Sequence, residues 1–382
     1  MTNTTILLPG LIDCHVHFRE PGYEHKATMA SEASAAQAGG VHTVCEMPNT
    51  NPPTTSVEAF KDKVHRAEKI SDVDIRFFFG ATELEHLNAF KQVWGSPQCC
   101  GLKIFFDHST GDQGANKQVI DEAFKLCAEL DAPLVAHCED ALINAEAKKQ
   151  ILEDAQGDES DVGLHSLMRP CAAEVAAITQ ALEYAEHYGT RLHVAHLSTA
   201  EGLRKICQAK KKKIAVTCQV TPHHLFLSTQ DYARLGSLGK MNPPLRTPSE
   251  CAALWEGIAD GTVDCIATDH APHTLAEKNA NPPLSAPSGV PGVETMLPLL
   301  LTVAAGGWPH PAGESYAVDF SYEKITELCC INPNRIFRLQ KNSGPLLTID
   351  PDAEWVIHGK DLHSLCGWTP YEGWIVRGKI VS

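Results

Sequence analysis

The sequence predicts an α/β fold, a TIM-type (β/α)8 barrel with a small β appendage built from the N- and C-terminal segments. Three observations support this prediction. Eight short apolar runs are bounded by turn residues, helix-like segments separate most of them, and almost every run ends in a polar or ionisable residue. Such alternation is typical of a parallel sheet with crossover helices, and eight parallel strands close economically into a barrel.

The predicted strands and helices follow one another along the chain. The apolar runs predict strands over 11–17, 41–47, 74–80, 101–106, 133–139, 191–197, 214–220 and 263–269. Helical periodicity predicts helices over 27–38, 56–70, 116–130, 171–188, 199–209 and 248–260. The strand runs are continuously apolar, which suits strands buried on both faces. Because barrel enzymes carry their reactive groups at the C-terminal ends of the strands, the polar endings should face one another.

After residue 280 the composition and the pattern of apolar residues change. Residues 281–292 are rich in Pro, Ser and Gly, which predicts a long loop at the barrel mouth, and an apolar helix-like run follows over 293–305. Beyond about residue 344 the chain is strand-like and contains three tryptophans. We therefore expect a barrel over 8–340 and an appendage formed by 1–7 together with 341–382.

Composition excludes several classes of protein. With 43% hydrophobic and 21% charged residues, the 382-residue chain can bury a substantial core. A net charge of −15 without an aromatic-rich basic patch argues against a nucleic-acid partner. No apolar stretch reaches the roughly 18 residues that span a bilayer, and the first ten residues do not resemble a signal peptide. The 14 cysteines form no C-x-x-C pair and several lie inside apolar runs, which favours a reducing, cytoplasmic location.

The candidate functional residues lie at the ends of the predicted strands. His15 and His17 are two residues apart, so their imidazoles project from the same face at the end of the first strand. Imidazole pairs are zinc ligands, although this pair alone could equally be two ordinary polar residues. The other strand endings favour the metal, because they add further nitrogen and oxygen donors at Lys103, His137, His196 and Asp269.

Lys103 is unusual because it lies inside the apolar run Gly-Leu-Lys-Ile-Phe-Phe. A buried ammonium is costly and normally loses its charge or finds a partner. One interpretation is a lysine that extends to the barrel mouth. The other is a neutral amine that reacts with carbon dioxide to form a carbamate, whose two oxygens could bridge two metals. Only the neighbouring candidate ligands favour the second interpretation.

Several segments resemble the dihydroorotases of the amidohydrolase superfamily. The resemblance lies in residues 10–22, 47–50, 101–105, 267–273 and 291–300, and it covers roughly residues 8 to 340. Segments 217–227 and 273–278 are most similar to the dihydroorotase domain of the multifunctional animal pyrimidine-synthesis polypeptide. The resemblance implies reversible zinc-dependent cyclisation of N-carbamoyl-L-aspartate to (S)-dihydroorotate in pyrimidine (UMP) biosynthesis, by a homodimer.

The resemblance also implies roles for individual residues. One Zn²⁺ would be held by His15, His17 and Asp269 and a second by His137 and His196, with carboxylated Lys103 and a hydroxide as bridges. Asp269 would also be the catalytic base. Substrate contacts would come from Arg19, Asn49, Asn242 and His273, with Arg19 and Asn49 on the substrate carboxylate. Gln219 stands where the animal branch carries a glutamate resembling a ligand for an additional zinc, so we expect two metals rather than three.

Alternatives remain at this point. The loop after the fourth strand, with Ser109 and Thr110, is either a lid over the substrate or an ordinary βα loop. Allantoinase and dihydropyrimidinase share the chemistry, but Arg19 after the histidine pair and the Met47-Pro-Asn49 segment argue against both. A non-catalytic structural barrel is the rival from a different class, and it is disfavoured because every ligand position is filled.

Overall fold

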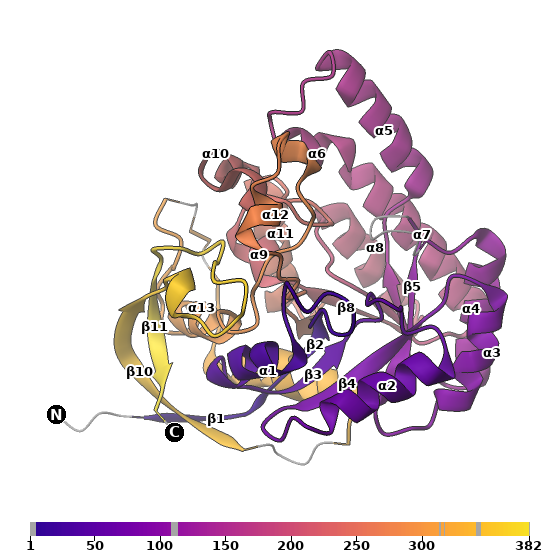
Figure 1. Cartoon of the computed structure of the whole chain (residues 1–382), viewed down its shortest axis with the longest axis horizontal. Coiled ribbons are helices and arrows are strands. Elements are labelled where there is room, and N and C mark those ends of the chain that lie inside the picture. The colour runs from indigo at the N-terminus through magenta and orange to yellow at the C-terminus, as the bar shows by residue number, and fades with distance from the viewer. Residues whose placement is uncertain (1–4, 108–113, 313–314, 317, 341–344, 382) are drawn as a thin grey trace.

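A parallel barrel forms the centre of the molecule (Figure 1). The computed structural model describes residues 5–107, 114–312, 315–316, 318–340 and 345–381. Eight strands pair in parallel and in chain order. They are β2 (Leu11–Val16), β3 (Val41–Glu46), β4 (Asp74–Gly80), β5 (Cys99–Phe105), β6 (Leu134–His137), β7 (Leu192–Val194), β8 (Val216–Val220) and β9 (Cys265–Ile266). The predicted barrel is confirmed, and β6, β7 and β9 are shorter than predicted because their polar endings leave the sheet.

Contacts between the first and last strands bring the barrel close to a full ring. Val16 and His270 form an isolated parallel bridge, and the His17 backbone N–H donates to the His270 carbonyl at 2.7 Å. Lower in the barrel, the Thr268 N–H donates to the Asp13 carboxylate at 3.0 Å. The segment after β9 is therefore fixed against the end of β2, where His15 and His17 lie.

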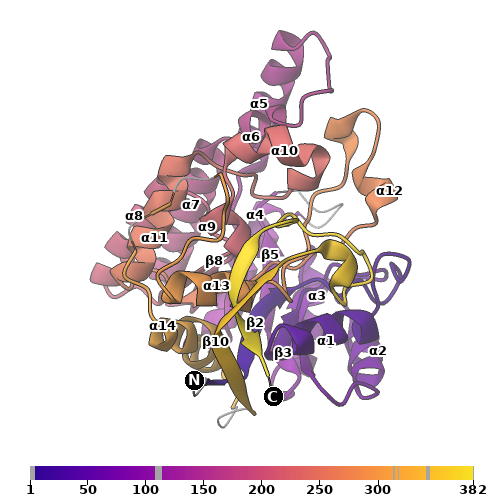
Figure 2. The same cartoon turned by 90° about the vertical axis from the view of Figure 1, so that its left-hand side faces the viewer.

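Helices lie around the barrel, and α5, α6 and α10 lie above it in the view of Figure 1 (Figures 1 and 2). They are α1 (Met29–Ala38), α2 (Val57–Ala67), α3 (Leu84–Val93), α4 (Lys117–Glu129), α5 (Ala141–Asp154), α6 (Leu164–Met168), α7 (Cys171–Tyr188), α8 (Ala200–Lys211), α9 (Pro222–Phe226), α10 (Tyr232–Leu235), α11 (Pro248–Ala259), α12 (Leu275–Lys278), α13 (Met296–Ala304), α14 (Tyr322–Thr326) and α15 (Asn332–Ile336). Short 3-10 turns occupy Thr229–Asp231, Gly236–Gly239, Pro283–Ser285 and Gly359–Asp361, and a π turn occupies Glu327–Ile331. Among the described helices, none combines the length and the apolarity needed to cross a lipid bilayer.

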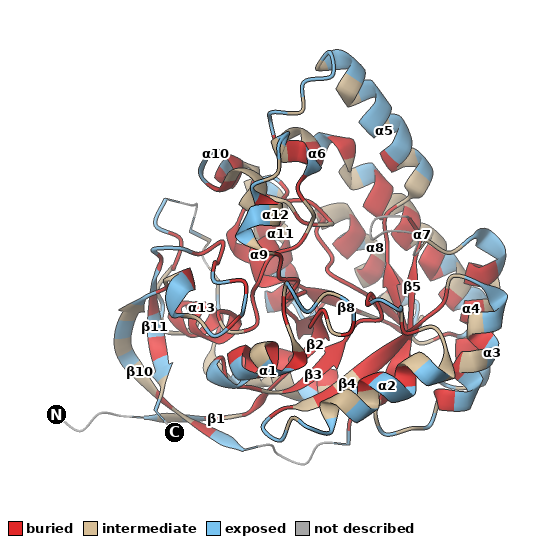
Figure 3. Ribbon diagram, viewed as in Figure 1, coloured by how far each residue is buried: buried red, intermediate tan, exposed pale blue. Residues whose placement is uncertain are grey.

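All six predicted helices are present, with ends that differ by at most three residues. Ser56, Asn116 and Thr199 were predicted as first residues and are N-caps, whose side chains accept hydrogen bonds from the first turn. The prediction omitted α3, although its buried residues follow helical spacing. It also omitted α5, which buries only Asn144 and so carries no apolar stripe for periodicity to reveal. Figure 3 shows α5 as a largely exposed helix above the barrel.

An antiparallel sheet lies beside the barrel and joins the first and last described segments of the chain (Figure 1). Its strand order is β1 (Ile6–Pro9), β10 (Leu346–Val356) and β11 (Ile375–Ile380). The predicted appendage from both ends of the chain is therefore confirmed. Helix α13 packs against β11 at Gly378, where a Cβ atom would lie 2.5 Å from the Leu301 side chain. Gly378 also has a φ of +86°, so both space and backbone conformation require glycine there.

The barrel interior is closed at the N-terminal end of the strands by the last residue of α15 and residues just after it. Ile336, Phe337 and Leu339 pack with the inward-facing side chains of the strands in one buried cluster. Arg191, just before β7, donates to the Ile336 carbonyl at 2.8 Å and places this plug at the strand starts. The opposite, C-terminal end of the barrel is consequently the open one.

Replacing Phe337 with Ala is expected to lower the free energy of unfolding by about 3–5 kcal/mol, because a large ring leaves a cavity in a closed interior. The ring contacts Phe78 edge to face, with ring centroids 5.4 Å apart, and it is 2% exposed. Urea titration followed by tryptophan fluorescence would measure the loss. Phe337→Leu should cost much less, and an Ala variant as stable as the original would show that the plug is not packed as described.

Candidate active site

Imidazole and carboxylate groups converge at the open end of the barrel. His15 lies in β2 and His17 just after it, and both present Nε2 to the same oxygen of Asp269, which follows β9. The Nε2 to Oδ1 distances are 3.2 Å for His15 and 3.1 Å for His17. Both histidines thus reach Asp269, while the ligand atoms that lie within 4.8 Å of one another belong to His15, His196 and Asp269, a group that joins the two predicted metal positions.

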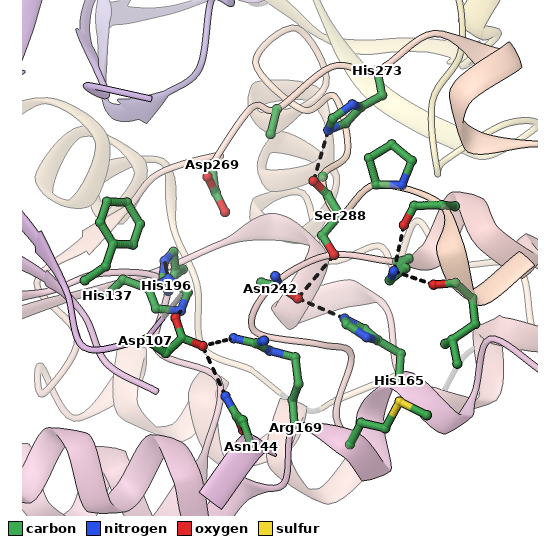
Figure 4. A pocket seen from close by; sticks show the side chains of 18 of the residues that line it. Asp107, His137, Asn144, His165, Arg169, His196, Asn242, Asp269, His273 and Ser288 are labelled. Carbon is green, nitrogen blue, oxygen red and sulfur yellow. Dashed lines mark hydrogen bonds and ion pairs between the residues drawn. The ribbon is translucent and has the colours of Figure 1, made fainter. Parts of the chain in front are cut away.

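A second group adjoins the first, and Figure 4 labels its members His137 and His196 together with Asp269 of the first group. His137 ends β6 and His196 follows β7, and His137 Nδ1 lies 2.9 Å from His196 Nε2. The ring centroids of His15 and His196 are 5.3 Å apart, which places the two groups side by side. Lys103, from the middle of β5, lines the same cavity. The sequence expectation that the strand endings face one another matches this geometry.

The protonation states suit metal binding. Burial lowers the pKa of His15 and His196 well below the usual histidine range, and it lowers the pKa of His17 to about 4. These imidazoles are therefore neutral at physiological pH, the form in which histidine binds metals. Burial alone would raise the pKa of Asp269, but the neighbouring histidines hold it well below its usual range, so this carboxylate is ionised.

Lys103 is buried without a hydrogen-bond partner for its Nζ among the described residues. Burial lowers the pKa of Lys103 to about 8, so a substantial fraction of the amine is neutral near physiological pH. The Nζ atom lies 4.9 Å from the centre of the Phe105 ring. A buried amine without a partner among the described residues, beside five candidate metal ligands, agrees with the carbamate interpretation better than with a lysine that extends to the barrel mouth.

Three of the eight described non-glycine residues with a positive φ lie at this end of the barrel. Arg19, His196 and Asp269 have φ values of +67°, +35° and +47°, in the left-handed region that non-glycine residues rarely adopt. Such conformations persist where the surrounding structure holds them, and they cluster at functional sites. The strain at three of the predicted site residues is consistent with a function for this region.

The converging groups line a cavity of about 850 Å³. Three of the four predicted substrate residues, Arg19, Asn242 and His273, also line it. Asn49 is not among its described lining residues, although the amide of Asn49 is buried and unpartnered within the described part of the chain. The predicted lid residues Ser109 and Thr110 lie outside the described residues.

Arg19 and His273 lie side by side at the cavity wall. Arg19 Nε donates to the Pro272 carbonyl at 3.0 Å, and Arg19 Nη2 lies 3.0 Å from His273 Nε2. Burial lowers the pKa of Arg19 to about 10, which still leaves it a cation. Trp368 donates its indole N–H to the His273 carbonyl at 2.7 Å, so the C-terminal segment supports this wall.

Asn242 is oriented by two donors that the sequence did not reveal (Figure 4). Its Oδ1 lies 2.9 Å from His165 Nε2 and accepts from the Ser288 hydroxyl at 3.2 Å. Burial lowers the pKa of His165 to about 3, so this histidine is neutral. The amide oxygen is thereby engaged by the protein, which directs the donor side of Asn242 to other partners.

Gln219 lies behind the first group rather than in the cavity. Its amide nitrogen is 2.5 Å from His15 Nδ1, and its amide oxygen is within 3.2 Å of His193 Nε2 and of Cys14 Sγ. The side chain is completely buried. A neutral amide with these contacts agrees with the expectation that no third metal binds here, which stays a prediction.

A cluster of buried charged side chains lies beside His137, and the sequence analysis did not predict it. It consists of Asp107, Glu139 and Arg169, with Glu139 Oε2 at 2.8 Å from His137 Nε2. The His137-Cys138-Glu139 spacing could have indicated the pair of side chains, because residues two apart share a strand face. Arg169 carries no such local signal, since it lies 62 residues from Asp107.

Comparison with known proteins agrees with this geometry. The sequence profile of the amidohydrolase family matches residues 6–349. A dihydroorotase of Halobacterium salinarum is 41% identical, over 96% of this chain and 82% of the relative. Dihydroorotases of Methanosarcina mazei and Staphylococcus epidermidis are each 38% identical, over 97% and 98% of this chain and 80% and 84% of the relatives.

Solved structures of related enzymes have the same fold. The L-hydantoinase (dihydropyrimidinase) of Arthrobacter aurescens superimposes with a TM-score of 0.89 at 28% identity, over 99% of this chain and 83% of its own. The dihydropyrimidinase of Brevibacillus agri, at 21% identity and a TM-score of 0.88, supports the fold alone. The chain belongs to the amidohydrolase family. Within that family it belongs with the dihydroorotases. The finer likeness of 217–227 and 273–278 to the animal polypeptide stays a prediction.

Proposed function

We propose that this protein is a dihydroorotase, which closes N-carbamoyl-L-aspartate to (S)-dihydroorotate and opens the ring again. The convergence of His15, His17, His137, His196, Lys103 and Asp269 beside a buried arginine in one cavity is the observation that carries the proposal. The dihydroorotase relatives support the choice of reaction within the family. The proposal includes small-molecule substrates, a cytoplasmic location and a homodimer.

The donor set fits two divalent metal ions. His15, His17 and Asp269 would hold one zinc, His137 and His196 would hold another, and carboxylated Lys103 would bridge them. Neutral imidazoles and an ionised carboxylate are the protonation states such ligands need. When bound, the metal ions would polarise the substrate carbonyl and lower the pKa of water in the site.

The residues of the chain move the proton and hold the substrate. Asp269 would accept a proton from the attacking water and deliver it to the departing ring nitrogen, so one carboxylate acts as base and then as acid. In the opposite direction it would take the proton from the ureido nitrogen as the ring closes. Arg19 would bind the substrate carboxylate with two parallel N–H donors. His273 and Asn242 would complete the cavity wall around the ring.

Replacing Arg19 with Met is expected to lower kcat/KM for dihydroorotate about 10- to 100-fold, mainly through KM, because a charge-assisted hydrogen bond contributes about 1.5–3 kcal/mol. Steady-state kinetics in the ring-opening direction would measure it. Arg66 provides a matched control, since its guanidinium pairs with Glu20 and Asp62 near the protein surface. Arg66→Met should leave kcat/KM within about twofold by comparison with typical surface changes.

A substrate comparison tests the proposed function itself. Purified protein would be assayed with dihydroorotate, allantoin and dihydrouracil under the same conditions, with zinc content measured in parallel. Turnover of dihydroorotate well above the other two is expected. Activity on allantoin or dihydrouracil without activity on dihydroorotate would assign the protein to a different cyclic-amide hydrolase, and folded protein without zinc and without activity would favour a structural role.

A further inference from the structure

Glu139 is a completely buried carboxylate placed directly behind a predicted metal ligand. It follows His137 by two residues, and its Oε2 lies 2.8 Å from His137 Nε2. On its other side, Arg169 donates from Nε to both carboxylate oxygens of Glu139, at 3.0 and 3.2 Å, and from Nη2 to Oε2. Glu139 is thus the charged partner of a buried ion pair, because two guanidinium nitrogens of Arg169 donate to its carboxylate.

The same arginine binds the end of the neighbouring strand. Arg169 Nη2 also donates to Asp107, which follows β5, and Asp107 accepts from Asn144 Nδ2 of α5 at 3.2 Å. Figure 4 shows Arg169 and Asn144 both directed at Asp107. Asp107, His137 and Glu139 could themselves be taken for a metal site, since their ligand atoms lie within 4.8 Å of one another. A guanidinium between the two carboxylates makes that interpretation unfavourable, because it already supplies the positive charge.

An ionised carboxylate can only accept hydrogen bonds, so His137 must carry its proton on Nε2 to satisfy Glu139. The lone pair of the ring is then on Nδ1, the atom that lies 2.9 Å from His196 Nε2. Histidine ligands are commonly fixed in this way by a carboxylate on the nitrogen that does not bind the metal. The contacts therefore fix which nitrogen of His137 is available for a metal and where it points.

We propose that Glu139, held in place by Arg169, is a positioning residue that presents His137 Nδ1 to the second metal of the site. The proposal rests on the two-metal centre proposed above. It adds the two side chains that orient His137, one of the ligands of the second metal. The second metal would be held by two imidazoles besides the shared bridge, whereas the first would also have a carboxylate, so binding of the second would depend more on the orientation of each ligand. Loss of Glu139 should therefore lower the affinity for the second metal more than the affinity for the first.

The test is zinc binding by the Glu139→Gln variant of the full chain, equilibrated in a series of buffered free Zn²⁺ concentrations. Glutamine keeps the shape of the side chain but loses the charge that binds Arg169 and polarises His137. The Kd of the weaker zinc is expected to rise about 10- to 100-fold, while the tighter zinc is retained. Bound metal per chain would then fall from two to one at intermediate Zn²⁺ concentrations.

Glu174→Gln is the matched control. Glu174 is also a buried carboxylate, bonded to the Ser198 N–H and hydroxyl at 2.8 and 2.6 Å with Arg246 at 3.9 Å, but it contacts no predicted ligand. It should keep both zinc affinities. Histidine ¹⁵N NMR provides an independent readout, since His137 should be the Nε2–H tautomer in the original protein and should lose that preference in Glu139→Gln.

The outcomes separate the two proposals. If the original protein binds two zinc ions and Glu139→Gln binds them with unchanged affinities, Glu139 has no positioning role. If the original protein binds fewer than two, the two-metal centre itself is wrong and the positioning role is overturned with it. Should Glu139→Gln fail to fold, Arg169→Lys carries the test, because it keeps the charge but cannot bind two carboxylates with a planar fork. It should weaken the same zinc, and unchanged affinities would overturn the proposal.

Discussion

Asp269→Asn is expected to lower kcat by about 10⁴-fold, the upper end of what a positioned proton-transfer group contributes, while the protein stays folded. Asparagine has nearly the same size as aspartate but cannot accept a proton at physiological pH. It also removes the anionic oxygen to which His15 and His17 both point, at 3.2 and 3.1 Å. The substitution therefore removes a base and weakens a predicted metal site at once.

Single-turnover kinetics, circular dichroism and zinc content would be measured together for this variant. Asp264, just before β9, provides a control at the opposite end of that strand, because it is paired with Lys210 at 2.6 Å and does not line the cavity. Asp264→Asn should keep kcat within a few-fold. If Asp269→Asn binds two zinc ions and still turns over at more than a tenth of the original rate, Asp269 is not the proton-transfer group.

Sequence reasoning located the barrel and the candidate site because both have local signals. A buried parallel strand is a continuous apolar run, and a ligand at its C-terminal end is the polar residue that terminates the run. His15, His137 and His196 were found in this way, and the fold determines that they meet. Lys103 was found because a charged residue inside such a run conflicts with its surroundings.

Groups that act through distant contacts have no such signal. Arg169 reaches Glu139 across 30 residues, and Trp368 reaches the His273 carbonyl across 95. Neither contact leaves a periodicity or a spacing in the sequence, because the pairing is set by how helices and loops pack above the barrel. Helix α5 was missed for a different reason, since its residues favour a helix but it buries a single side chain and lacks the apolar stripe that helical periodicity detects.

Lys103→Gln is expected to lower kcat/KM by about 10³-fold, because it removes the group that would bridge the metals and several kcal/mol of charge stabilisation with it. The size and polarity of the side chain are largely kept. Zinc per chain should fall together with activity. Lys103→Arg separates the two interpretations of this residue, since arginine could replace a cation that extends towards the cavity but cannot form a stable carbamate at physiological pH.

Carbamate formation has a signature that no other role of Lys103 shares. The amine has no partner among the described residues and its pKa is about 8, so its neutral fraction can attack dissolved carbon dioxide, forming the N–C bond and losing a proton to water or buffer. Protein loaded with zinc in the presence of ¹³C-bicarbonate should show a carbamate carbon signal that is missing in both Lys103 variants. Reactivation of metal-stripped protein should likewise be slower in buffer freed of carbon dioxide. An equal rate with and without bicarbonate, together with an active Lys103→Arg variant, would mean that the lysine contributes its charge, and the two metals would then need a different bridge.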